Sequence, residues 1–140
     1  MALALDSLQK AVSALAAVLA KSDDVEFMNR LDEAARNAIK AGVVLHFEFT
    51  YELFWKFIKR WLETNVSPAV ADGVTRRELF RLAAENRLLD DVEQWMRYHE
   101  ARNLPSRIYQ PEIAERVYNA AHAFSRDAAR LLAALEARND

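Results

Sequence analysis

The segment from Val43 to Leu62 places the strongest constraint on the fold of this chain. Its apolar and aromatic side chains follow one another so closely that they would cover nearly every side of a helix. A surface helix shows one apolar stripe, whereas a helix that is apolar all round is buried on more than one side. We therefore expect other helices to surround this segment and a second subunit to cover what remains, through some of Phe47, Phe54, Trp55 and Trp61.

Few residues in the chain would interrupt a helix. Its 140 residues include only two glycines and three prolines, among abundant Ala, Leu, Glu and Arg. This composition is typical of an all-α protein, and the length is typical of one domain. We predict that residues 1–140 form a single antiparallel up-and-down four-helix bundle, with short helices inserted between the third and the last.

Apolar spacing and capping residues predict where the helices begin and end. The first helix is expected from about Leu3 to Ala20. The second starts near Asp24 and runs to Thr64, with Gly42 as the one place for a kink or a join. The other expected elements are a loop at 65–73, a helix from Arg76 to about Glu85 with Asn86 as a left-handed cap, a short helix ending near Arg102, and a long last helix from Pro111. Capping boxes are expected at three helix starts, namely Asp23 with Glu26, Thr75 with Glu78, and Asp90 with Glu93.

Composition also limits the classes of function. The chain has no cysteine, so it can form neither a disulfide nor a thiolate metal site. Its net charge of -2 argues against a general nucleic-acid coat protein. No apolar run is long enough for a membrane span, and the first residues lack the basic start of a secretory signal, so we expect a cytoplasmic protein. We find no nucleophile triad, no metal-ligand spacing among the three histidines and no Gly-rich phosphate loop.

The break between the last two helices carries an unusual set of polar side chains. Arg102, Asn103, Ser106, Arg107 and Tyr109 lie within a short segment that Pro105 and Pro111 restrict. Two guanidinium groups, an amide and a phenol at this spacing suit a site that contacts phosphate or nucleotide. The alternative is an ordinary loop whose arginines pair with nearby carboxylates.

Two further polar sets accompany the aromatic segment. Glu48 and Tyr51, beside Phe47 and Trp55, are candidates to line a groove or a dimer interface, although a solvated polar strip of Glu48, Glu52, Lys56 and Lys59 is the favoured alternative. The next helix carries a basic edge, which we interpret as a solvated face rather than a nucleic-acid track; its residues are Arg76, Arg77 and Arg81.

Two segments together resemble a known family. Residues 47–56 read Phe-Glu-Phe-Thr-Tyr-Glu-Leu-Phe-Trp-Lys, which is similar to the FE(F/Y)TYELxWK signature of bacterial and archaeal nucleotidyltransferase substrate-binding proteins. Downstream, Glu100-Ala101-Arg102-Asn103 with Ser106 and Tyr109 resembles the xxRNxxSHxY segment of the same proteins. These proteins belong to the HEPN superfamily of helical bundles.

The resemblance implies a homodimer with a separate enzymatic partner. In this family the partner is a small, separately encoded protein with the nucleotidyltransferase fold. It supplies the metal-binding carboxylates and would use ATP or another nucleoside triphosphate with magnesium, so no cofactor or metal is expected in this chain. The family implies a non-catalytic accessory subunit of a two-component nucleotidyltransferase or of a prokaryotic toxin–antitoxin module.

The family also implies an alternative, a ribonuclease toxin that combines an arginine with a histidine four to six residues later. By this resemblance Arg102 is the motif arginine and Tyr109 is the tyrosine to which the partner adds a nucleotide. The histidine position is occupied by Arg107. A histidine exchanges protons near neutral pH, whereas an arginine binds phosphate but is a poor base. This departure favours a binding role over an intact ribonuclease, because His99 precedes Arg102 and cannot be assumed to replace the missing histidine.

Overall fold

The computed structural model describes residues 2–104 and 110–139, and every regular element in these ranges is a helix. This confirms the all-α class. The helices are α1 (Asp6–Asp23), α2 (Val25–Asn29), α3 (Glu33–Asn65), α4 (Arg76–Glu85), α5 (Val92–Arg102) and α6 (Pro111–Ala137).

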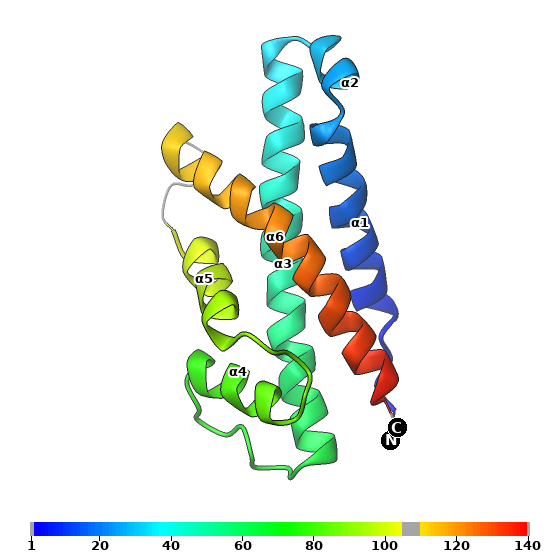
Figure 1. Cartoon of the computed structure of the whole chain (residues 1–140), viewed down its shortest axis with the longest axis vertical. Coiled ribbons are helices and arrows are strands. Elements are labelled where there is room, and N and C mark those ends of the chain that lie inside the picture. The colour runs from blue at the N-terminus through cyan, green and yellow to red at the C-terminus, as the bar shows by residue number, and fades with distance from the viewer. Residues whose placement is uncertain (1, 105–109, 140) are drawn as a thin grey trace.

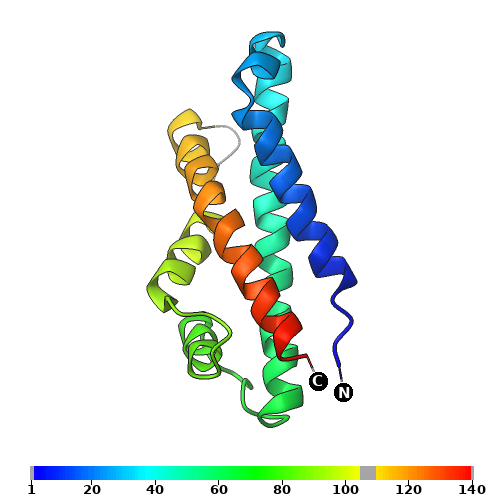
Figure 2. The ribbon, with the colours of Figure 1, turned by 45° about the vertical axis from the view of Figure 1, so that its right-hand side comes forward.

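Helices α1, α3, α5 and α6 form an up-and-down bundle. Helices α1 and α5 run in one direction and α3 and α6 in the other (Figure 1). Helix α3 is central, because it packs against α1, α4, α5 and α6. Figure 2 shows α1 on one side of α3 and the α4–α5 pair on the other. The two chain ends lie together, where the Leu3 N–H donates to Asn139 Oδ1 at 2.7 Å. The short helix α4 is inserted between α3 and α5, the second and third members of the bundle, and not between the third and the last as expected.

The aromatic segment is enclosed by its neighbours, as its sequence predicts. Phe47 and Phe54 are 0% exposed, and Tyr51 is 1% exposed. They meet Phe124 of α6, whose ring centroid lies 5.0 Å from that of Phe47 and 6.2 Å from that of Phe54. The apolar residue of this segment that faces outward most is Phe49, at 58% exposed.

This burial corrects the expected interface. We expected a groove or a dimer interface lined by Phe47, Glu48, Tyr51 and Trp55, with the interface using some of Phe47, Phe54, Trp55 and Trp61; of these residues, Phe47, Tyr51, Phe54 and Trp61 do not fit that role. All four are buried within the chain instead, because α5 and α6 close over this side of α3. Among the residues named for that role, Trp55 is partly exposed.

The boundary between the first two long helices differs from the prediction. The expected second helix is divided into α2 and α3, because Asp24 caps α2 and the Asp32 side chain accepts a hydrogen bond from the Ala35 N–H at 2.8 Å. Asp24, and not Asp23, is therefore the capping residue. Helix α3 continues without interruption through Gly42, where a side chain would meet only Val18 Cγ2 at 3.7 Å.

The later caps are mostly as expected. Thr75 caps α4, and Pro111 occupies the first turn of α6. The α5 cap is Asp91 rather than Asp90. The left-handed residue after α4 is Arg87, with φ of 62°, and not Asn86. The Arg87 and Leu88 N–H groups donate to the carbonyl oxygens of Ala84 and Ala83, so the helix end is a Schellman motif with an arginine where glycine is usual.

Candidate functional site

A polar cluster lies where α3, α4 and α5 meet. Helix α3 contributes one face of its central turns, α4 its first residue, and α5 its last turn together with the following cap. Because these positions are far apart in sequence, packing of the three helices creates the cluster. Its members are Tyr51, Glu52, Trp55, Arg76, His99, Arg102 and Asn103.

Glu52 is the carboxylate at the centre of the cluster. Its Oε2 accepts a hydrogen bond from Trp55 Nε1 at 2.9 Å. Its Oε1 lies 3.2 Å from Nε of Arg102. That contact is an ion pair without the alignment of a hydrogen bond, since Arg102 Nε is buried and has no hydrogen-bond partner among the described residues. The Arg102 guanidinium is thus held beside a carboxylate and retains donor capacity.

Arg76 adds a second guanidinium, which lies against the Trp55 ring. Its Cζ lies 3.6 Å from the centroid of the Trp55 ring, which is the geometry of a cation–π stack. Burial lowers the pKa of Arg76, and negative charge at Glu52 works against this effect. Arg76 Nε is also buried with no hydrogen-bond partner among the described residues. The charge of the two guanidinium groups favours an anionic group beside them, since one carboxylate, Glu52, lies against the pair.

A hydrogen-bonded chain joins Tyr51, His99 and Asn103. The Tyr51 hydroxyl lies 2.8 Å from His99 Nδ1, and Asn103 Nδ2 lies 3.1 Å from His99 Nε2. When the Asn103 amide donates to Nε2, the imidazole proton sits on Nδ1 and is donated to the Tyr51 oxygen. Burial and the nearby Arg76 charge lower the pKa of His99, so its imidazole is neutral near pH 7. Burial raises the pKa of Tyr51, which stays protonated.

The structure brings together part of the predicted site. Arg102 and Asn103 lie in the cluster with Tyr51 and Trp55, whereas Phe47 is in the core and Glu48 is half-buried on α3. Three of the predicted residues lie outside the described ranges, namely Ser106, Arg107 and Tyr109.

Sequence reasoning missed the contributions of Arg76 and His99. Arg76 was interpreted as part of a solvated edge, and no local pattern shows that it stacks on Trp55. His99 was set aside because it precedes Arg102, although a position three residues earlier on one helix places both side chains on neighbouring faces. That spacing was the available signal.

Two further features were sought among the described residues, a metal-binding group and a membrane-spanning helix. Within residues 2–104 and 110–139, no group of three His, Asp or Glu side chains is arranged to hold a metal ion. No helix in the same ranges is long and apolar enough to cross a membrane.

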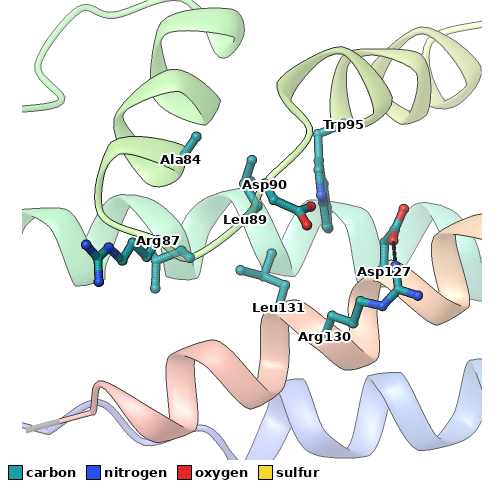
Figure 3. Close-up of a pocket in the computed structure, with 9 residues that line it drawn as sticks. Ala84, Arg87, Leu89, Asp90, Trp95, Asp127, Arg130 and Leu131 are labelled. Atoms are coloured by element: carbon teal, nitrogen blue, oxygen red, sulfur yellow. Dashed lines mark hydrogen bonds and ion pairs between the residues drawn. The ribbon is translucent and has the colours of Figure 1, made fainter.

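A separate hollow of about 340 Å³ lies between the α4–α5 connection and α6. Figure 3 shows Trp95, Asp90 and Leu131 at this hollow, with Arg130 and Asp127 side by side. Arg130 Nη1 donates to Asp127 Oδ1 at 3.0 Å. Because charges of both signs line the same wall, this hollow offers a ligand less net charge than the cluster around Arg76 and Arg102.

Comparisons with known proteins agree with this fold. The family of proteins described as nucleotidyltransferase substrate binding protein like matches residues 3–137, and the chain therefore belongs to this family. A relative from Haemophilus influenzae, described as probable ribonuclease HepT, is 29% identical over 138 residues, which cover 96% of this chain and 93% of the relative. A solved structure from Haemophilus influenzae, described as the substrate binding domain of a nucleotidyltransferase, superposes with a TM-score of 0.90 at 26% identity, covering 95% of this chain and 99% of that one.

Proposed function

We propose that this chain is the non-catalytic substrate-binding subunit of a two-component nucleotidyltransferase. Its partner would be a separately encoded minimal nucleotidyltransferase that uses ATP or another nucleoside triphosphate with magnesium. The observation that carries the proposal is the pair of guanidinium groups around Glu52 and Trp55, which sets two positive charges against one carboxylate. Such donors suit a phosphate-bearing substrate or an acidic group at the partner's active site.

The proposal has two testable parts, association and transfer. Affinity capture of the tagged chain from its own cells is expected to recover a small protein with the nucleotidyltransferase fold. Replacing both guanidinium groups, by Arg76→Met with Arg102→Met, is expected to weaken that capture or the binding of substrate to the pair. Capture of no such protein by the unaltered chain would refute the proposal.

Covalent transfer to the chain itself is measured by mass. Incubation with the captured nucleotidyltransferase, ATP and magnesium, followed by mass spectrometry, distinguishes a chain that presents a substrate from one that accepts a nucleotide at Tyr109. A mass gain that disappears in Tyr109→Phe would identify the acceptor. No gain would leave the chain as the subunit that presents a separate substrate.

We also propose that the protein is a homodimer. The support is a pair of exposed apolar side chains that lie one turn apart on α3. Leu45 is 54% exposed and Phe49 is 58% exposed. Two large apolar side chains on one face of a helix are costly to leave in water and are common at the centres of interfaces.

A second candidate function is a ribonuclease, favoured by the position of His99. If substrate displaced the Asn103 amide from Nε2, the neutral imidazole would accept a proton there while the Arg102 guanidinium held a phosphate. We nevertheless expect no RNA cleavage by the purified protein, because Arg107 stands at the histidine position of the family motif. Cleavage of single-stranded RNA that is lost in both His99→Asn and Arg102→Ala would instead favour the enzyme. Arg107→His tests whether the remaining site supports activity once the motif is restored.

A further inference from the structure

A hollow of about 250 Å³ lies on the α4 side of Trp55, next to the polar cluster. Its apolar floor is formed by Ala71 and Leu79, which are 3% exposed each. Its polar lining residues are Lys59, Thr75 and Arg76. The complete lining is Trp55, Lys59, Ala71, Gly73, Val74, Thr75, Arg76 and Leu79.

The lining holds two cations and no carboxylate. Glu52, the acidic residue nearest to Trp55 along this face of α3, is engaged by the Trp55 indole N–H and by Arg102. Lys59 has no ion-pair partner among the described residues. The positive charge of this hollow is therefore not neutralised by its own walls, in contrast to the hollow that holds Asp127 and Arg130.

We infer that this hollow is a phosphate-binding pocket, which takes a dianionic phosphate or a diphosphate group. Lys59 supplies a compact, mobile ammonium, and Arg76 is held in place by its stack on Trp55. The Thr75 oxygen accepts a hydrogen bond from the Glu78 N–H, which leaves the hydroxyl proton free to be donated to a ligand oxygen. Its volume lies just below the range of about 300–1,000 Å³ that holds whole ligands, so the pocket suits one charged moiety rather than a nucleoside.

The inference rests on the proposed function and specifies it. Trp55 and Arg76 belong both to the polar cluster and to this pocket, so a ligand in the pocket would contact two residues of that cluster. The substrate presented to the nucleotidyltransferase is then a molecule that carries a terminal phosphate or diphosphate.

Isothermal titration of the whole chain tests the pocket, with inorganic pyrophosphate and ADP as probes and adenosine as the uncharged comparison. Pyrophosphate and ADP are expected to bind and adenosine is not. Affinity for pyrophosphate equal to that for ADP indicates that the phosphates alone are recognised, whereas tighter ADP binding indicates a nucleotide. Binding of adenosine as tight as that of ADP, or no binding of either charged probe at millimolar concentration, would overturn the inference.

Two variants locate the binding. Lys59→Met is expected to weaken pyrophosphate about tenfold or more, since it removes one charge-assisted contact. Lys56→Met is the matched control, because Lys56 is exposed on the same helix, with its Nζ 5.7 Å from the Trp55 ring centroid, but does not line the pocket. Its affinity should stay within about twofold of the parent chain. If both variants weakened pyrophosphate binding equally, the affinity would depend on general surface charge, and the pocket would be refuted.

The test of the pocket can fail independently of the test of the proposed function. Capture of the nucleotidyltransferase by the unaltered chain, together with no pyrophosphate or ADP binding, would refute the pocket alone. Failure of capture would refute the proposed function whatever the probes do. Thermal melting of Lys59→Met checks its fold, and Lys59→Gln gives a second, polar replacement that is expected to weaken pyrophosphate to a similar extent.

Discussion

Replacing Phe124 by alanine should destabilise the fold more than most single substitutions. Phe124 is 0% exposed, and its ring lies 5.0–6.5 Å from the rings of five other aromatic residues. Loss of a buried phenyl ring costs about 3–5 kcal/mol through lost transfer energy and the remaining cavity. The five edge-to-face and tilted contacts place this site at the upper end of that range. The neighbouring rings are Phe47, Tyr51, Phe54, Trp95 and Tyr98.

Urea unfolding followed by far-UV circular dichroism measures this loss. A decrease of that size corresponds to a fall in Tm of roughly 10–20 °C for a domain of this length. Phe27→Ala on α2 is the matched control, because Phe27 is partly exposed and lies outside the ring cluster, with Lys21 Nζ 4.9 Å from its ring centroid. Its cost should be about 1 kcal/mol. A loss below about 1.5 kcal/mol for Phe124→Ala, or equal losses for the two variants, would refute the cavity argument.

Three other substitutions test the interface, the left-handed cap and the buried histidine. Phe49→Glu should shift the sedimenting species to the 16.0 kDa chain, and a dimer that survives it would place the interface elsewhere. Arg87→Gly should raise the free energy of unfolding by about 1 kcal/mol, because φ of 62° strains an arginine but not a glycine, and an unchanged urea midpoint would contradict this. The folded-state pKa of His99 is lowered, so its contribution to stability should be present above about pH 6.5 and be lost as pH falls through the folded-state pKa. His99→Gln should remove that part of the pH dependence, and identical pH profiles for the two proteins would exclude the linkage.

The fold follows from the sequence because local signals agree with one another. The limits of α4 and the proline start of α6 are as the capping residues predict. The division of α2 from α3 was missed, because the Asp32 cap lies inside a segment with continuous helical composition. Arg87 was missed as the left-handed residue, because asparagine adopts that conformation more readily than arginine; the structure places Arg87 there and buries Leu88 directly after the turn.

The site was predicted only where its residues are close in sequence. Arg102 and Asn103 were identified from one short segment, and Tyr51 and Trp55 from another. The stack of Arg76 on Trp55 depends on how α4 docks against α3, and no periodicity in α4 encodes that docking. His99 joins the site because its ring reaches Tyr51 across the α3–α5 contact. Such cross-helix contacts are tertiary, and a single sequence does not specify them.

The uninterrupted length of α3 has a consequence for any assembly of this chain. At 1.5 Å per residue, Phe49 precedes Glu52 by only about 4.5 Å along the helix axis. A twofold dimer that buried Phe49 would therefore set two copies of the polar cluster on one rigid frame, close to the shared axis. A substrate or partner with two anionic groups could then engage both copies at once. Its binding would gain from avidity, and the gain would depend on the spacing of the two groups rather than on any new contact.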